Sequence, residues 1–143
     1  MPVGAESPDA LVDTSVAVAL VVADHEQHDA ARRAVGSRSV GLAGHAAFET
    51  VSVLTRLPVP LRRTPRTVAR LIEDNFPCGY FLSSEGAEAL WSRLVPWGIK
   101  GGAVYDALVG AAAREAQLVL LTADTRALAT SRALDARVEL VGG

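Results

Sequence analysis

Four acidic residues stand where they could do chemistry together: Asp13, Glu49, Asp106 and Asp124. Asp106 is the only charged side chain in the stretch GGAVYDALVGAAA, and Asp13 is the only one between Asp9 and Asp24. A single carboxylate in apolar surroundings is unfavourable, and several together repel one another. Such a group is stable when it takes up protons or binds cations, so these acids predict a cation site.

The donor set indicates which cation to expect. Carboxylate oxygens without histidine or cysteine suit hard divalent ions, so Mg²⁺ is expected first and Mn²⁺ second. Divalent ions held by carboxylates orient and deprotonate a water, and they stabilise charge on a phosphate and on its leaving oxygen. The predicted chemistry is therefore hydrolysis of a phosphodiester bond.

The elements that must position these acids alternate between strands and helices. Short apolar runs predict strands at 9–13, within 37–43, and at 78–82, 117–123 and 137–141. Capping residues, prolines and glycines predict helices at 15–24, 26–35, 45–57, 65–76, 84–95 and 103–117, and a last helix from residue 124. This alternation predicts a three-layer α/β/α sandwich with a mainly parallel central sheet, formed by residues 1–143 as a single domain.

In such sheets, active sites form at the carboxyl ends of the strands. Asp13 ends the first strand, and Asp124 follows the strand at 117–123. Glu49 lies in the first turns of the helix that leaves the second strand. The helix from Asp106 onward covers about 17 Å, and the following strand returns about 17 Å. We therefore expect the four carboxylates to meet at one edge of the sheet.

Hydroxyl side chains stand beside two of these acids: Thr14, Ser15 and Thr122. They could hold a carboxylate rotamer or a metal-bound water, and ordinary helix capping explains them equally well. Capping also offers a structural explanation for Asp13 and Asp124, and a solvated helix face offers one for Glu49.

Four basic residues are candidates for contacts with phosphate: Arg62, Arg63, Lys100 and Arg126. The first two lie in an arginine-rich stretch that has no acidic residue between Glu49 and Glu73. Arginine is the side chain best suited to forked contacts with phosphate. A solvated surface face is the alternative explanation for these charges.

Composition excludes several classes of protein. The longest apolar run, at 16–23, is far shorter than the roughly 18 residues of a membrane span, and no secretory signal is visible. The single Cys78 excludes an internal disulfide and a thiolate metal cluster. We expect a cytoplasmic protein that does not bind membranes.

Four sequence motifs together resemble those of PIN-domain nucleases: LVDTSV, AAFETVSVL, GGAVYDALV and LLTADTRAL. In length and in GGAVYDALV the chain is most similar to VapC-type toxins of bacterial toxin–antitoxin pairs. The resemblance implies an endoribonuclease that uses Mg²⁺ or Mn²⁺ to cut structured RNA such as tRNA or rRNA. It also implies a homodimer, and inhibition by a cognate antitoxin whose C-terminal segment crosses the active-site groove.

The four acids match the acids of that family position by position. The resemblance implies that all four acids are catalytic and that Asp13, Asp106 and Asp124 bind the metal. Family members often carry a further acid or asparagine shortly after the fourth motif. Arg126 stands in that region here, so the sequence leaves a second metal position open.

Two other functions remain open at this point. A Mg²⁺-dependent phosphatase of another α/β family is the first, but such enzymes typically have a second aspartate two residues after the first. That position is Ser15 here. The second is a non-catalytic domain that acts only by binding RNA or protein.

Overall fold

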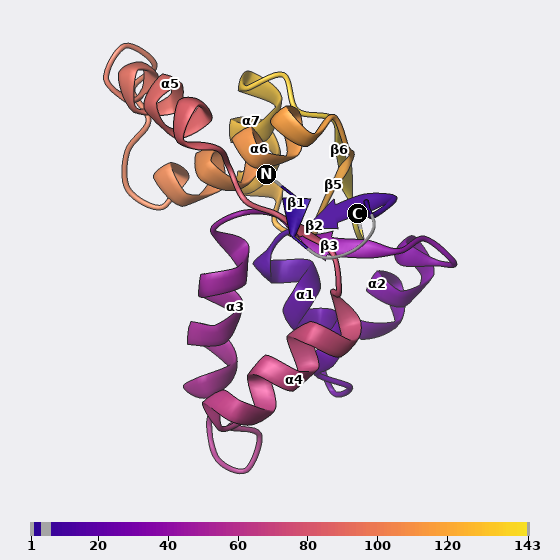
Figure 1. The fold of residues 1–143 in the computed structure, drawn as a ribbon. Helices are drawn as coiled ribbons and strands as arrows, with labels where there is room; N and C mark the ends of the chain where they lie inside the picture. Colours follow the sequence, from indigo (N-terminus) through magenta and orange to yellow (C-terminus); the bar gives the residue numbers. More distant parts are fainter. Residues whose placement is uncertain (1, 4–6, 143) are drawn as a thin grey trace.

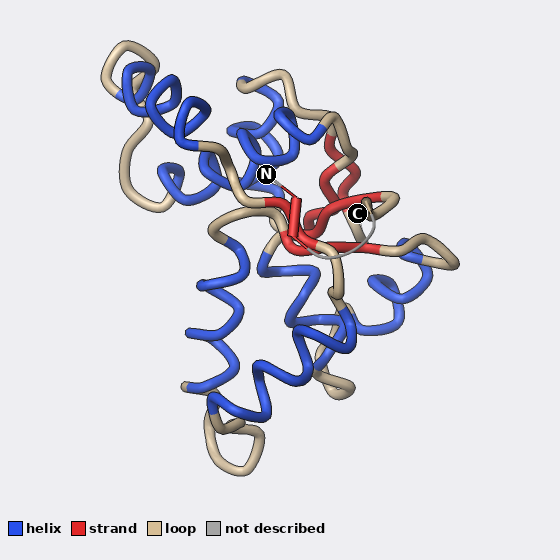
Figure 2. Tube along the Cα trace, in the orientation of Figure 1, coloured by secondary structure: helices blue, strands red, loops and turns tan. Residues whose placement is uncertain are grey.

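The computed structural model describes residues 2–3 and 7–142. Its main sheet has four strands in the order β3-β2-β5-β6, and all neighbouring pairs are parallel. The strands are β2 (Ala10–Val12), β3 (Val40–Leu42), β5 (Leu120–Thr122) and β6 (Val138–Leu140). This arrangement confirms the predicted mainly parallel sheet, which lies at the centre of the molecule (Figure 2).

Strand β2 is central because its residues are apolar and have neighbours on both sides. Val12 pairs with Leu42 of β3 and with Leu121 of β5. All three residues of β2 are completely buried, as expected for a parallel strand covered on both faces. The carboxyl end of β2 leads directly into Asp13.

Helices cover both faces of this sheet, which confirms the predicted three layers (Figure 1). One face carries α1 (Thr14–Val21), α2 (His28–Val35), α3 (Ala46–Thr55) and α4 (Pro65–Asn75). The other carries α5 (Ser84–Leu94), α6 (Ala103–Ala116) and α7 (Thr125–Ala133). In the part of the chain that the structure describes, no helix is both long enough and apolar enough to cross a membrane.

A second, smaller sheet differs from the expectation. The stretch 78–82 contains only the short strand β4 (Gly79–Tyr80), which pairs antiparallel with β1 (Pro2–Val3). The sequence predicted no strand at β1. Strand β4 joins the edge of the main sheet through a parallel bridge between Ala43 and Tyr80. Pairs of two-residue strands have no periodic pattern that a sequence could reveal.

Glycines at two positions permit close packing between neighbouring segments. A Cβ atom at Gly41 of β3 would lie 1.5 Å from the Cys78 carbonyl oxygen, so only glycine fits there. At Gly110 of α6, a Cβ atom would lie 3.0 Å from the Ser131 hydroxyl of α7. Helices α6 and α7 therefore pack closely and hold their first turns near the same sheet edge.

Candidate active site

One pocket of about 240 Å³ opens at the carboxyl edge of the sheet. Its lining combines four acids with neighbouring hydroxyl and apolar residues: Asp13, Thr14, Ser15, Glu49, Asp106, Val109, Leu120, Asp124, Ala127 and Ser131. The structure thus brings together the acids from the ends of β2 and β5 and from the first turns of α3 and α6. They come from four separate parts of the chain.

Asp13 is the most buried of the four acids, with 8% of its surface exposed. It is the N-cap of α1, and its Oδ1 accepts the Val16 backbone N–H at 3.1 Å. Burial raises the pKa of this carboxyl, hydrogen bonds from Ser15 and Thr122 oppose that rise, and the negative charge of Asp124 adds to it.

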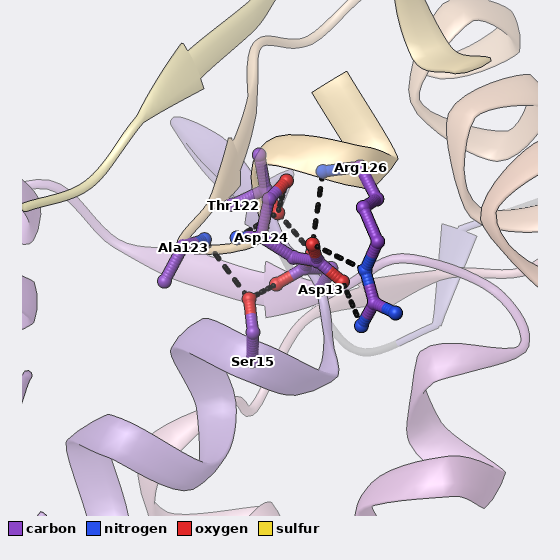
Figure 3. A network of polar contacts seen from close by, with 6 residues as sticks. All are labelled: Asp13, Ser15, Thr122, Ala123, Asp124 and Arg126. Atoms are coloured by element: carbon purple, nitrogen blue, oxygen red, sulfur yellow. Dashed lines mark hydrogen bonds and ion pairs between the residues drawn. The ribbon is translucent and has the colours of Figure 1, made fainter. Parts of the chain in front are cut away.

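Two hydroxyls fix the Asp13 carboxylate from opposite sides (Figure 3). Ser15 Oγ donates to Oδ1 at 2.6 Å, and Thr122 Oγ1 donates to Oδ2. Each hydroxyl also accepts a backbone N–H from the loop after β5: Ser15 from Ala123 at 2.9 Å, and Thr122 from Asp124 at 3.1 Å. These bonds tie the ends of β2 and β5 together and leave the carboxylate little freedom to rotate.

Thr14 differs from these two hydroxyls. Its Oγ1 donates to the Ala46 carbonyl oxygen at 3.4 Å, so it connects α1 to α3 and does not bond an acid.

Glu49 and Asp106 both lie in the first turns of their helices, where the helix dipole favours negative charge. Both side chains are partly buried. Burial raises the pKa of Glu49, His45 opposes the rise, and Asp106 and Asp13 add to it. Burial also raises the pKa of Asp106, with further increases from Asp124 and Asp13 and a decrease from Arg126. The negative charges of these acids therefore raise one another's pKa, as expected for members of one site.

Asp124 makes its closest contacts with Arg126. It is the N-cap of α7, and its Oδ1 accepts the Arg126 backbone N–H at 2.9 Å. The guanidinium donates to the same carboxylate through Nε at 3.3 Å and through Nη2 at 3.4 Å. Capping and ion pairing thus both involve this one carboxylate.

The other predicted phosphate-binding residues lie away from the pocket lining. Arg62 and Arg63 are in the loop between α3 and α4, at the end of α3 remote from Glu49 (Figure 1). Arg62 donates to the Leu57 carbonyl oxygen at 2.9 Å. Lys100 is exposed in the turn before α6. Of the four predicted phosphate-binding residues, Arg126 is the one that contacts an acid of the pocket, Asp124.

Comparison with known proteins identifies the fold that carries this pocket. The family model for the PIN domain matches residues 10–133, a range that includes all four acids. The chain belongs to the PIN-domain family.

Named relatives of this PIN domain come from Mycobacterium tuberculosis. The chain is 48% identical over 120 residues to ribonuclease VapC27 of strain ATCC 25618 / H37Rv, covering 84% of this chain and 88% of the relative. It is 46% identical over 130 residues to ribonuclease VapC40 of strain CDC 1551 / Oshkosh, covering 90% of this chain and 96% of the relative.

Solved structures share the architecture at lower sequence identity. Mycobacterium tuberculosis VapC20, described as a sarcin-ricin loop cleaving toxin, matches with a TM-score of 0.65 and 22% identity over 84% of this chain and 93% of the other. FitAcB from Neisseria gonorrhoeae matches with a TM-score of 0.61 and 16% identity over 90% of this chain and 95% of the other. These likenesses establish the fold.

The acids of this PIN domain share a pocket but are not arranged as a finished ligand set. Within residues 2–3 and 7–142, no three side chains of the types His, Cys, Asp and Glu lie close enough to hold one ion. Asp13 is held by hydroxyls, and Asp124 is turned toward Arg126. The donor set still fits a hard divalent cation, because it consists of oxygen ligands whose negative charges raise one another's pKa.

Two residues at the site were given no role by the sequence. His45 lies one helical turn before Glu49, with Nε2 3.9 Å from Oε1, and it stacks on Tyr105 at a centroid distance of 4.9 Å. The spacing of four residues was a usable signal for that pair. Ser131 lines the pocket, and among the described residues its buried hydroxyl has no hydrogen-bond partner. It has no neighbouring motif that could have marked it.

Proposed function

We propose that this PIN domain is a metal-dependent endoribonuclease that acts as the toxin of a toxin–antitoxin pair in the cytoplasm. One observation carries the proposal: Asp13, Glu49, Asp106 and Asp124 come from separate elements and line one pocket. Such convergence is hard to explain by capping, because Glu49 and Asp106 cap no helix. The names of the relatives, ribonuclease VapC27 and VapC40, support RNA as the substrate.

Asp13, Asp106 and Asp124 are the residues that would hold the ion, with Mg²⁺ as the expected metal and Mn²⁺ as a substitute. When bound, the ion supplies charge neutralisation and an activated water for attack on a phosphodiester bond. Asp13 is the fixed member, because Ser15 and Thr122 determine where its two oxygens point. Those two hydroxyls therefore act by positioning the carboxylate.

Glu49 is proposed to accept and return protons at the pocket. Its raised pKa makes the carboxylate a better proton acceptor than an ordinary glutamate near neutral pH. The neighbouring His45 opposes that rise in the pKa of Glu49.

The proposed substrate is a structured RNA of the tRNA or rRNA class. Arg126 stands at the pocket, and Lys100 precedes the helix that carries Asp106. Arg62 and Arg63 lie farther along the surface, where they could bind phosphates of an RNA that extends beyond the cut bond.

A cognate antitoxin and a second copy of this chain are the proposed protein partners. The description of VapC20 as a toxin supports the first. The homodimer is supported by two exposed aromatic side chains, Phe48 at 63% and Tyr105 at 49%, which precede Glu49 and Asp106 in the sequence. A second copy of the chain could cover this apolar surface. Light scattering during size-exclusion chromatography tests the dimer, and co-expression with the neighbouring reading frame tests the antitoxin.

RNA cleavage in vitro tests the enzymatic proposal. Purified protein is incubated with total tRNA and rRNA in Mg²⁺, in Mn²⁺ and in EDTA, beside Asp13→Ala and Asp106→Ala variants. We expect cleavage that requires the metal and both aspartates. RNA binding without cleavage by a folded, metal-supplied wild type would contradict the proposal and favour a binding domain. Release of phosphate from small phosphate esters without RNA cleavage would favour a phosphatase.

A further inference from the structure

Arg126 places a positive charge on one of the proposed metal ligands. Its guanidinium contacts both oxygens of Asp124, Nε to Oδ1 at 3.3 Å and Nη2 to Oδ2 at 3.4 Å (Figure 3). Asp124 and Arg126 are only two residues apart at the start of α7. Their side chains can therefore pair without any rearrangement of the fold. The same charge lowers the pKa of Asp106, so it extends over the pocket.

We propose that Arg126 is a built-in counter-ion that competes with the divalent metal for Asp124. The inference rests on the proposed function, because it takes Asp124 as a metal ligand. In the absence of metal, the guanidinium neutralises Asp124 and reduces repulsion among the pocket acids. When a divalent ion binds that carboxylate, the guanidinium is displaced. Arg126 therefore raises the metal concentration at which the pocket fills.

Exposure explains why the displacement is easy. The Arg126 side chain is 88% exposed, whereas that of Asp124 is 32% exposed. The guanidinium can therefore move into solvent without leaving a buried charge behind. Exposed ion pairs of this kind are weak, so the competition corresponds to about a two- to fivefold difference in metal affinity. An effect of that size tunes metal loading and does not block it.

The freed guanidinium would then remain at the mouth of the pocket. Arginine recognises phosphate through a planar fork, and the start of a helix adds a positive dipole. Metal binding would thus expose a phosphate-binding group at the place where RNA must enter.

Mn²⁺ binding to the RNA-free protein tests the competition, with free Mn²⁺ measured by electron paramagnetic resonance. Arg126→Gln is compared with Arg132→Gln, which removes the same charge from an exposed position farther along α7. We expect Arg126→Gln to bind Mn²⁺ about two- to fivefold more tightly than wild type, and Arg132→Gln to bind it like wild type. Equal or weaker binding by Arg126→Gln would overturn the proposal.

A double-mutant cycle separates direct pairing from a general charge effect. Arg126→Gln is repeated in an Asp124→Asn background, where the carboxylate is absent and the gain in affinity should disappear. A gain of the same size in both backgrounds would show that Arg126 acts only through its long-range field and would overturn the proposal. Failure of the proposed function gives a different result: wild type would bind no Mn²⁺, or Asp13→Asn would bind it as wild type does.

Discussion

The Thr122 hydroxyl donates a hydrogen bond to Asp13 Oδ2 although the two residues are 109 positions apart in the sequence. Thr122 ends β5 and Asp13 follows β2, and these two strands are parallel neighbours in the sheet. The same oxygen of Thr122 accepts the Asp124 backbone N–H at 3.1 Å. One buried hydroxyl therefore fixes the relative positions of two proposed metal ligands.

Replacing Thr122 with valine tests this positioning role, because valine keeps the shape and removes the hydroxyl. We expect Thr122→Val to reduce metal affinity and RNA cleavage by about 10- to 100-fold. The free energy of unfolding should fall by about 1 to 3 kcal/mol, since Asp13 loses a buried donor. Mn²⁺ titration, cleavage rates and urea denaturation measure the three quantities.

Thr50→Val is the matched control for that change. Thr50 is also completely buried, but its hydroxyl donates within α3 to the Ala46 carbonyl oxygen at 2.7 Å. This variant should lose about 1 kcal/mol of stability and keep its metal affinity and cleavage rate. Equal losses of cleavage in both variants would mean that Thr122 is merely a structural residue.

Asp106→Asn should abolish activity while leaving the fold intact or more stable. The proposed ligand is lost, so RNA cleavage is expected to fall by more than about 100-fold, which exceeds the effect of removing an outer-shell partner. The stability gain comes from removing a carboxylate that burial and the charges of Asp124 and Asp13 make unfavourable. A folded variant with full cleavage activity would contradict this role.

The stability gain of Asp106→Asn is expected to depend on pH in EDTA. The pKa of Asp106 is raised in the native state, so ionisation is less favourable there than in the unfolded chain. This lowers wild-type stability as pH rises above the ordinary value of 3.8, until the raised native pKa is passed. The difference in melting temperature between variant and wild type should therefore be small near pH 3 and grow toward pH 7. A difference that shrinks with increasing pH would show that the pKa is lowered instead.

Much of the fold was predictable because local signals and tertiary packing agree. The apolar run that forms β5 is bounded by Gln117 and Asp124, and the latter caps α7. Asp13 and Asp124 directly follow predicted strands, so parallel topology alone placed them at one edge. The position of Asp106 at this edge could be predicted from the lengths of α6 and β5 alone. Their roles in metal binding and catalysis remain predictions.

Other features depend on contacts that no local pattern encodes. Strands β1 and β4 are two residues long, and each pairs with a segment far away in the sequence. The pairing of Arg126 with Asp124 depends on the conformation of an exposed side chain, which the sequence does not specify. Arg62 and Arg63 were grouped with the site by their charge, whereas the loop after α3 holds them away from the pocket lining.

Gly41 is expected to be irreplaceable for folding. A Cβ atom there would lie 1.5 Å from the Cys78 carbonyl oxygen and 3.0 Å from Gly79 Cα, which are backbone atoms with little room to move. Gly41→Ala should therefore destabilise the protein by more than about 3 kcal/mol or prevent folding. Gly102→Ala is the control, because nothing lies within 4 Å of its Cβ position. Urea denaturation should show a change within about 1 kcal/mol for that variant, and similar stabilities for the two would contradict the packing described here.

Arg62 and Arg63 test whether RNA extends along the surface beyond the pocket. Reversing both to glutamate should weaken RNA binding and flatten its salt dependence. The slope of log K against log salt should fall in magnitude by about 0.7 to 0.9 for each phosphate that the protein no longer neutralises. Arg32→Glu with Arg33→Glu is the control, since it makes the same charge change at an exposed adjacent pair in α2. Fluorescence anisotropy with labelled RNA at several salt concentrations, in the Asp106→Asn background that prevents cleavage, measures both slopes. Equal slopes for the two double variants would mean that Arg62 and Arg63 contribute only to the net charge. The bound RNA would then contact only the pocket and Arg126.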